Sequence, residues 1–213
     1  PMAYLIRQSV LDPDTGSFTL AYFTKFFSKS YYFDTLINSF KVSITATVLS
    51  IAIGTPLAYL FTIFKIKGKS VLNILIVVAS MSAPFIGAYS WILLLGRSGI
   101  ITTFFKNLGI AIPDIYGIVL VMTLQLFPLV FLYAKGALKN IDNSLIEAAE
   151  NLGCSGIVCF FKVVVPLIMP TLLAAALLVF MRSFADFGTP MLIGEGYRTF
   201  PVVLYTEFIN EVG

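Results

Sequence analysis

Histidine is absent from the 213-residue sequence, and cysteine occurs only twice, at Cys154 and Cys159. Two thiols do not supply the four nitrogen or sulfur ligands of a structural zinc site, so we predict that the chain holds no metal. The phosphate-binding pattern Gly-x-x-x-x-Gly-Lys-Ser/Thr is also missing, which argues against a nucleotide site within the chain. We therefore expect a protein that is not itself an enzyme and that carries no cofactor.

Charged residues are scarce. They make up 12% of the chain, against about 25% in an average soluble domain, while hydrophobic residues make up 58%. Four runs without any charged residue cover residues 42–64, 71–95, 115–134 and 163–181. Each run reaches the length of about 20 residues that a helix needs to cross the hydrocarbon core of a bilayer. We therefore predict a membrane protein with four spans in this sequence.

All 14 basic and 11 acidic residues lie between or beside these uncharged runs. Burying one charge at the centre of a bilayer costs roughly 3 kcal/mol or more, so this segregation is expected of spanning segments. A transmembrane barrel would instead show alternating segments of about 10 residues. The sequence thus predicts an all-α membrane protein, built as a bundle of transmembrane helices.

The sequence contains no internal repeat, low-complexity tract or Gly/Ser linker, so we expect a single transmembrane domain over residues 1–213. It starts at Pro1 and shows no secretory signal peptide with a basic start and a cleavage site. We interpret it as a fragment that lacks terminal spans, one before its start and at least one beyond Gly213.

Lysines gather in two of the segments that connect the spans. One segment holds Lys65, Lys67 and Lys69, and the other holds Lys135, Lys139 and Lys162. Because cytoplasmic loops carry an excess of Lys and Arg, we expect both segments on the cytoplasmic side, and residues 1–35, 96–114 and 182–213 on the outer side. The net charge of +3, without any block of like charges, gives no indication of nucleic-acid binding.

The second lysine-containing segment has the pattern of a short helix, a turn and another helix. Ser144-x-x-Glu147 fits a capping box that starts a helix. An apolar face follows at helical spacing and comprises Ile141, Leu145, Ala148, Ala149 and Leu152. Gly153 can adopt the left-handed conformation that ends a helix, and a second helical run starts at Ile157. We expect the apolar face to fit a groove in a partner.

This segment resembles the EAA loop of permease subunits of ABC importers. That signature runs Glu-Ala-Ala, three residues, Gly, nine residues and Ile-x-Leu-Pro, and the spacing here fits throughout. The matching residues are Glu147, Ala148, Ala149, Gly153 and Pro166, with Val163 and Val165 in place of Ile and Leu. The resemblance implies that residues 135–162 form a cytoplasmic coupling loop that sits in a cleft of an ATPase subunit. The alternative is an ordinary amphipathic connector.

The same resemblance implies a fold and a set of partners. It predicts the type I ABC importer permease fold, as a multi-pass protein within the lipid bilayer of a bacterial inner (plasma) membrane. A cytoplasmic ABC ATPase dimer would bind ATP and Mg²⁺, and an extracytoplasmic binding protein would deliver the substrate. A second permease half, identical or fused, would complete the substrate pathway.

Proline and glycine recur inside the predicted spans. Each proline removes a backbone donor, so we expect kinked or interrupted helices. The break between Pro84 and Tyr89 is the best candidate for backbone that lines a pathway, although a kink that serves only packing fits equally well. Gln125 is a polar residue at mid-depth of the third span. It faces either the pathway or a neighbouring helix, to which buried amides commonly hydrogen-bond.

The outer end of the fourth span carries Arg182 and Asp186, which are four residues apart and can pair across one helical turn. Residues 185–194 also resemble the corresponding segment of ferric-iron permeases, a group related to sulfate, polyamine and phosphonate permeases. By this resemblance Asp186 is a candidate pathway residue. Ferric iron is then the expected substrate, with a polyamine, sulfate or a phosphonate as alternatives.

Aromatic residues lie in the outer segments, among them Tyr31, Tyr197 and Tyr205. Such rings are typical of the belt at a membrane interface. Docking of a binding protein is the alternative explanation.

Two other classes of membrane protein fit the sequence less well. An ion-driven secondary transporter typically shows charged coupling residues within its spans and inverted repeats, and the sequence shows neither. A membrane-embedded enzyme needs nucleophile, base or metal groups, and the predicted spans contain no His, Asp or Glu. The sequence therefore favours an importer permease over both.

Overall fold

The computed structural model describes residues 7, 9–11, 17–64, 68–80, 90–91, 93–94, 99, 103–104, 114–154, 156–194 and 196–212. The elements are α2 (Ala21–Ser28), α3 (Ser30–Ile63), α4 (Lys69–Ser80), α7 (Asp114–Lys139), α8 (Asn143–Asn151), α9 (Gly156–Cys159), η1 (Phe160–Val164), α10 (Val165–Ala185), α11 (Gly188–Ile193) and α12 (Phe200–Val212). Within the described residues, β-pairing is limited to an isolated bridge between Leu11 and Phe18. The predicted all-α fold is confirmed.

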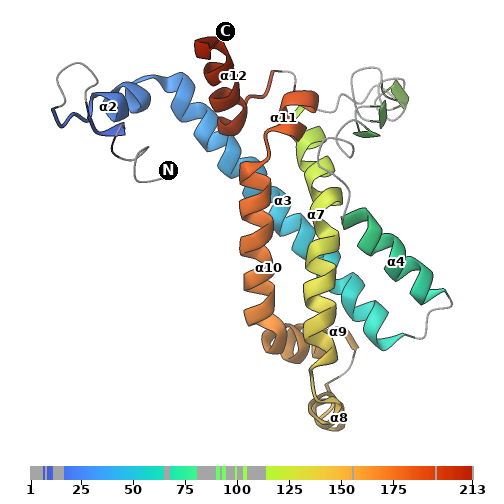
Figure 1. The fold of residues 1–213 in the computed structure, drawn as a ribbon. Helices are drawn as coiled ribbons and strands as arrows, with labels where there is room; N and C mark the ends of the chain where they lie inside the picture. The colour runs from blue at the N-terminus through green and yellow to red at the C-terminus, as the bar shows by residue number, and fades with distance from the viewer. Residues whose placement is uncertain are drawn as a thin grey trace.

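Three long helices form the centre of the molecule (Figure 1). α7 and α10 run side by side, and α3 crosses both, so that each of the three helices contacts the other two. α4 packs along α7. Among the described residues, three helical stretches are long and apolar enough to cross a membrane, and they are Ser30–Ile63, Ile115–Lys139 and Gly156–Ala185.

The helices extend beyond the uncharged runs that predicted them. α3 begins at Ser30 instead of near residue 42, α7 continues to Lys139, and the helical stretch that contains α10 starts at Gly156. Backbone hydrogen bonding continues into the interface, where charged side chains reach water while the helix goes on. The second predicted span, residues 71–95, is helical in α4 up to Ser80 and again at residues 90–91 and 93–94, and its other residues lie outside the described ones.

The helices run through their prolines without interruption. Pro56 lies inside α3, Pro128 inside α7 and Pro170 inside α10. Of the two expected outcomes, a kink or an interruption, the interruption does not occur at these three prolines. Opening the helix there would leave more backbone groups unsatisfied in lipid, so the helix continues through each proline. The break between Pro84 and Tyr89 lies outside the described residues.

The backbone pattern changes immediately before α10. η1 is a π-helical turn, and after it the amide of Val165 donates to the carbonyl of Phe160. Pro166 follows and has no amide hydrogen to donate. Single π turns within longer helices frequently mark functional positions. This one falls within the EAA pattern.

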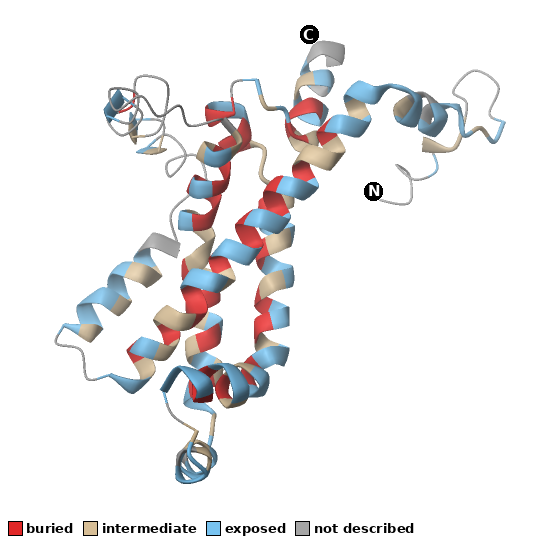
Figure 2. Cartoon of the chain, turned by 180° about the vertical axis from the view of Figure 1, so that it is seen from behind, coloured by how far each residue is buried: buried red, intermediate tan, exposed pale blue. Residues whose placement is uncertain are grey.

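The central helices bury their facing sides and expose their outward sides, as Figure 2 shows. Many of the side chains on the outward sides are large and apolar. The larger buried cluster joins all three helices and includes Phe61 of α3, Phe131 of α7 and Ile168 of α10. The α3–α7 contact is close, because a Cβ added at Gly54 would lie 2.9 Å from the Cβ of Val130. Apolar outward sides are what a bundle surrounded by lipid requires.

The two ends of the bundle carry different elements. α8, α9 and η1 lie at one end, whereas α2, α11 and α12 gather at the other (Figure 1). The EAA pattern is thus at the opposite end from the segment that resembles ferric-iron permeases.

Candidate functional site

α8 is the helix of the EAA pattern, and Asp142 caps it. The side-chain Oδ1 of Asp142 accepts a hydrogen bond from the amide of Ser144 at 3.0 Å. The capping box predicted Ser144 as the cap, and this is wrong by two residues, because aspartate caps as well as serine and its charge complements the helix dipole. Hydrogen bonds from Ser144, first of all from its backbone amide, hold the pKa of the Asp142 carboxyl below its usual value.

α8 ends in the turn that the sequence predicted. The amide of Cys154 donates to the carbonyl of Ala149 at 3.0 Å, and Gly153 between them has a φ of 85°. This six-to-one hydrogen bond with a left-handed residue is the Schellman arrangement, which glycine adopts without strain. Gly153 therefore sets the angle at which the chain leaves α8.

α8 has an anchored face and a free face. Ile146, together with Ile141 just before the helix, packs against the core cluster. Leu145 and Leu152 are 49% and 89% exposed, and Ala148 is exposed beside them. The single predicted apolar face is therefore only partly right, because Ile141 packs on the chain's own core and Ile146, which was not predicted, does the same. Spacing alone does not show which apolar residues of a helix pack against the core of the same chain and which stay exposed.

η1 links α8 to the spans. α8 contacts both α9 and η1. Phe160 of η1 is 7% exposed, and its ring centroid lies 4.6 Å from that of Tyr59 in α3. Packed side chains therefore connect α8 through η1 to the start of α10 and to α3.

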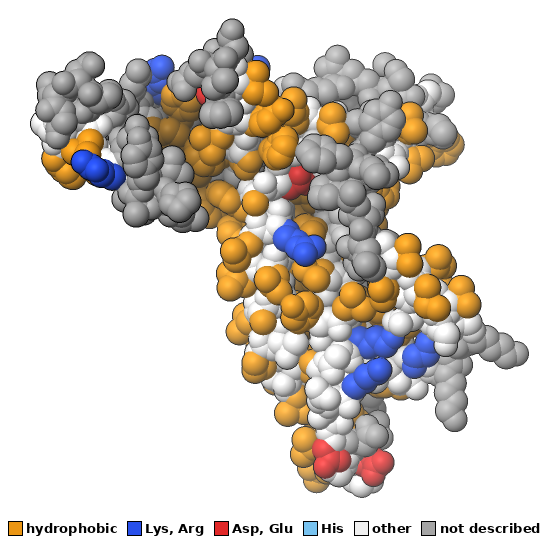
Figure 3. Space-filling model, viewed as in Figure 1, with side chains coloured by type: hydrophobic (Ala, Val, Ile, Leu, Met, Phe, Trp, Pro, Cys, Tyr) orange, Lys and Arg blue, Asp and Glu red, His pale blue; other side chains and the backbone are white. Residues whose placement is uncertain are grey.

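The structure brings the five predicted coupling residues into this one region. Glu147 and Ala148 are exposed on α8, Ala149 is half-buried there, Gly153 ends the helix, and Pro166 is exposed in the first turn of α10. Figure 3 shows acidic side chains at the tip of the molecule, over α8. The exposed surface of α8 thus combines apolar side chains with carboxylates.

Two of the four predicted pathway residues, Pro84 and Tyr89, lie outside the described residues. Gln125 is half-buried in α7, and its Nε2 atom is buried without a hydrogen-bond partner in the described part of the chain. The alternative explanation, a hydrogen bond to a neighbouring helix, is not seen for this atom within that part. Leaving such a donor unsatisfied costs about 1–3 kcal/mol, so we expect water or another subunit to bind it.

Asp186 follows α10 and caps α11. Its Oδ1 accepts hydrogen bonds from the amides of Gly188 at 2.9 Å and Thr189 at 3.3 Å, and its Oδ2 accepts one from the Thr189 hydroxyl at 2.6 Å. The carboxylate is directed to these residues and not to Arg182, because α10 ends at Ala185 before the turn that would pair them. Its role in the pathway stays a prediction.

Arg198 connects two segments at the end of the bundle opposite α8, and no sequence pattern indicated it. Its Nη1 donates to the hydroxyl of Tyr31 at 2.7 Å, and its carbonyl accepts a hydrogen bond from Nδ2 of Asn38 at 3.3 Å. A cavity of about 340 Å³ adjoins it and is also lined by Tyr197 and Glu207. Burial raises the pKa of the Tyr197 hydroxyl. Arg198 and Tyr31 are 167 positions apart, so only the fold brings them together.

The described residues include no group of three His, Cys, Asp or Glu side chains that could hold a metal ion. Cys154 is half-buried and Cys159 is buried, and the two are not joined in a disulfide.

The sequence of the chain is similar to those of known proteins. Residues 18–211 match the family model described as binding-protein-dependent transport system inner membrane component. The spermidine/putrescine transport system permease protein PotB of Haemophilus influenzae is 28% identical over an alignment of 222 positions, which covers 98% of this chain and 77% of that protein. The Fe(3+)-transport system permease protein FbpB 2 of the same organism is 26% identical over 173 residues, which cover 81% of this chain and 31% of that protein.

The fold is also similar to one that has been solved. A chain of the "Crystal structure of an amino acid ABC transporter with histidines" superposes with a TM-score of 0.56 at 18% identity, over 88% of this chain and 83% of that one. This likeness concerns the fold alone, whereas the family match extends over nearly the whole sequence and includes the EAA pattern. The chain belongs to the family of binding-protein-dependent transport system inner membrane components, the membrane-spanning permeases of ABC importers.

Proposed function

We propose that the chain forms part of a substrate pathway in a bacterial inner membrane and couples that pathway to a cytoplasmic ABC ATPase through α8. The division of α8 into an anchored face and a free face carries this proposal. The free face, with Leu145, Ala148 and Leu152, offers an apolar surface to the ATPase cleft. The anchored face, with Ile146, connects that surface to the spans.

Coupling then follows from close packing. When ATP closes the ATPase dimer, α8 shifts, and Ile146 transmits the shift to the cluster that joins α3, α7 and α10. Close-packed interiors respond by moving between discrete arrangements and not by gradual deformation. The permease acts as a two-state element, and the ATPase and the binding protein can drive it only because each binds the two states unequally.

A second permease half, identical or fused, completes the pathway in this proposal. Large apolar side chains face outward from the bundle; Val48 is 58% exposed, Leu173 63% and Leu177 61%. They supply surface for both lipid and a partner half. The unsatisfied Nε2 of Gln125 supports this proposal, because a group of that half, or water in the pathway, would accept its hydrogen bond.

The proposed orientation places α8 in the cytoplasm and the cavity beside Arg198 outside. The lysine-rich segments support it through the positive-inside rule. The outer cavity, lined by Tyr31, Arg198 and Glu207, offers polar groups to an extracytoplasmic binding protein.

Ferric iron is the substrate that we propose first. The support is the pattern of residues 185–194, which Asp186 organises by capping α11, together with the ferric relative. Polyamine import is the second candidate, favoured by the similarity to PotB along 98% of the chain. Tight binding of iron would rest with the binding protein, because hard metal ions need oxygen ligands and the predicted spans contain no Asp or Glu.

Uptake by the complete complex tests the substrate. Proteoliposomes that contain the permease, its ATPase and its binding protein are supplied with ferric iron, spermidine, sulfate or a phosphonate in parallel. ATP-dependent uptake of ferric iron alone supports the first candidate. Uptake of spermidine without iron establishes the second, and uptake of sulfate or a phosphonate contradicts both while the importer assignment stands.

Two variants of α8 test the coupling. Leu152→Ser alters the free face and should weaken ATPase binding roughly 10-fold or more, because a leucine buried in a cleft contributes about 1.5–3 kcal/mol. Ile146→Ala alters the anchored face, so the ATPase should still bind while substrate transported per ATP hydrolysed falls. Leu204→Ser is the control, since Leu204 is 55% exposed on α12 at the other end. Wild-type ATPase affinity in Leu152→Ser would contradict docking through this face.

A further inference from the structure

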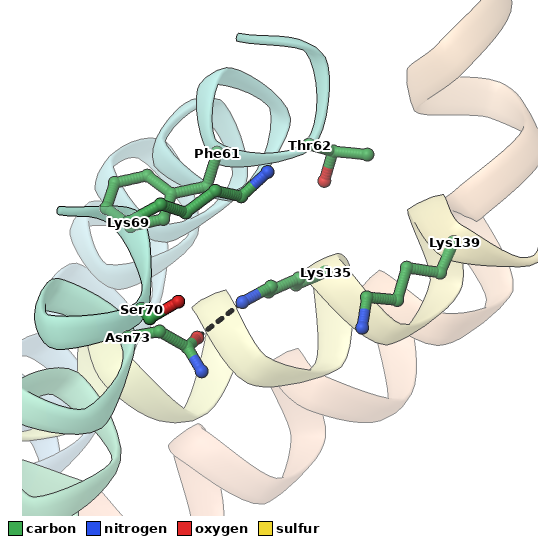
Figure 4. A pocket seen from close by; sticks show the side chains of 7 residues that line it. All are labelled: Phe61, Thr62, Lys69, Ser70, Asn73, Lys135 and Lys139. Atoms are coloured by element: carbon green, nitrogen blue, oxygen red, sulfur yellow. Dashed lines mark hydrogen bonds between the residues drawn. The ribbon is translucent and has the colours of Figure 1, made fainter. Parts of the chain in front are cut away.

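Three lysines converge on a cavity of about 360 Å³ where α3 and α7 end and α4 begins (Figure 4). Lys69 is the first residue of α4, and Lys135 and Lys139 lie one turn apart at the end of α7. Phe61 and Thr62 of α3 complete one wall. The side chains that line the cavity therefore come from three helices that are far apart in the sequence.

The positive charge of this cavity has no counter-ion in the described part of the chain. Lys135 donates a hydrogen bond to Oδ1 of Asn73, and its ammonium group lies 5.4 Å from the ring centroid of Phe131. None of the residues that line the cavity carries a carboxylate. Like charges one helical turn apart repel each other, so this grouping is unfavourable unless an anion joins it.

Polar donors accompany the lysines. Asn73 and Ser70 project from α4 beside Lys69, and Thr62 lies opposite on α3, as Figure 4 shows. Ammonium groups surrounded by amide and hydroxyl groups match the several oxygen atoms of a phosphate. The cavity thus has both the charge and the hydrogen-bonding groups for such an anion.

The outer side of α4 next to this cavity is apolar. Val71, Ile74 and Val78 are 61%, 59% and 59% exposed, and their spacing of three and four residues forms one stripe along the helix. Figure 3 shows basic side chains gathered beside the apolar side chains over α4. A charged cavity at the end of a span, continued by an apolar stripe along the same span, matches a lipid headgroup and its acyl chains.

We propose that the cavity binds the phosphate group of an anionic molecule at the membrane surface, and that this molecule is an anionic phospholipid whose chains lie along α4. The headgroup neutralises Lys69, Lys135 and Lys139 and thereby holds α4 against α3 and α7. Basic cavities between spans on the cytoplasmic side suit such headgroups. The site is independent of the transported substrate. Its assignment to the cytoplasmic leaflet rests on the orientation proposed above.

A lipid and a free phosphate offer the same anionic oxygens, so the test has two arms. In the first, the full-length permease is placed in nanodiscs of phosphatidylglycerol and phosphatidylcholine, and native mass spectrometry counts the phosphatidylglycerol molecules that it retains. In the second, inorganic phosphate is titrated into the permease in neutral detergent, and the thermal unfolding midpoint is followed.

The variants replace the lysines singly and together with glutamine. Each Lys→Gln change at 69, 135 or 139 should lower the affinity for phosphatidylglycerol roughly fivefold, and the triple variant should retain none above background. A triple Lys→Arg variant keeps the charge and should keep the lipid. Lys162→Gln is the matched control, because Lys162 is exposed on η1 at the same end and does not line the cavity. If the triple Gln variant does not fold, Lys139→Gln, which alters an exposed side chain, decides the question alone.

Each outcome decides the proposal. Selective retention of phosphatidylglycerol that depends on these lysines supports the lipid. A lysine-dependent rise of the midpoint with phosphate, without lipid retention, supports the phosphate site with a soluble ligand and refutes the lipid. Equal lipid retention in all variants with no response to phosphate overturns the proposal. Loss of ATPase binding alone also overturns it, since the lysines would then contact an acidic surface of the ATPase.

Discussion

Gly54 of α3 packs against Val130 of α7 so closely that a Cβ added at Gly54 would lie 2.9 Å from the Cβ of Val130. The same atom would lie 3.0 Å from the backbone carbonyl of Phe127, which has little freedom to move. The close approach of α3 and α7 at this point thus depends on the absence of one side chain. Small residues are the usual means of bringing membrane helices together.

We predict that Gly54→Ala destabilises the bundle. The added methyl group would force α3 and α7 apart, and overpacking of this kind typically lowers the free energy of unfolding by about 1–3 kcal/mol. The midpoint of thermal unfolding in detergent measures the effect. Gly136→Ala in α7 is the control, because nothing lies within 4 Å of its added Cβ, and its midpoint should stay the same or rise. Equal midpoints for both variants would show that the α3–α7 contact is looser than described.

A second prediction concerns the turn after α8. Gly153 has a φ of 85° and open space around its Cβ position, so a substitution there acts through backbone strain and not through a clash. Gly153→Val should insert into the membrane normally but lose most substrate-stimulated ATP hydrolysis, because the strain of about 1–2 kcal/mol would alter the angle between α8 and α9. Hydrolysis is measured with the reconstituted ATPase and binding protein.

Gly153→Asn provides the matching control for that experiment. Asparagine tolerates the left-handed conformation better than any β-branched residue, so this variant should keep most of the stimulated activity. Full activity in Gly153→Val would remove the turn from the coupling mechanism.

The third prediction concerns the cap of α8 and its pH dependence. Ser144 lowers the pKa of the Asp142 carboxyl from its usual value of 3.8. Because the pKa is lower in the folded state, the cap contributes fully above pH 3.8 and is lost as the pH falls through the lowered pKa. Carbon-13 NMR of the labelled carboxyl in micelles should show a pKa below 3.8.

Changes at Ser144 separate the two hydrogen bonds that cause this pKa. Ser144→Ala removes only the hydroxyl group and should return the pKa of Asp142 partly toward its usual value. Ser144→Pro removes the amide donor as well, in the first turn where proline is tolerated, and should return it further. An unchanged pKa in Ser144→Pro would show that the cap does not form.

The fourth prediction concerns orientation. Cys154 is half-buried, whereas Cys159 is 1% exposed, so a membrane-impermeant maleimide should label Cys154 and spare Cys159. Labelling should require inverted vesicles, because the α8 end is proposed to face the cytoplasm. Cys154→Ser should abolish the signal and Cys159→Ser should leave it intact. Labelling of Cys154 in sealed intact cells would reverse the orientation.

The sequence by itself determined the features that depend on residues close to one another along the chain. Uncharged runs predicted the spans of α3, α7 and α10, because lipid excludes charge from a spanning helix whatever its neighbours are. The spacing from Glu147 to Pro166 indicated the EAA pattern, whose coupling role stays a prediction. The position of Gly153 after an apolar repeat predicted the left-handed turn that the structure contains. Local propensity did not identify Asp142 as the cap of α8, because Asp142 and Ser144 both satisfy the pattern of a cap.

Only the tertiary structure decided which residues meet across the chain. It showed that Ile146 anchors α8 while Leu152 stays free, because that choice depends on where η1 and the core lie. It brought Lys135 to Asn73, 62 positions away, and so assembled a basic cavity that no sequence motif indicated. Hydropathy and spacing specify the helices and their ends. Contacts between residues distant in the sequence depend on how those helices cross. Close packing at positions such as Gly54 decides how they cross.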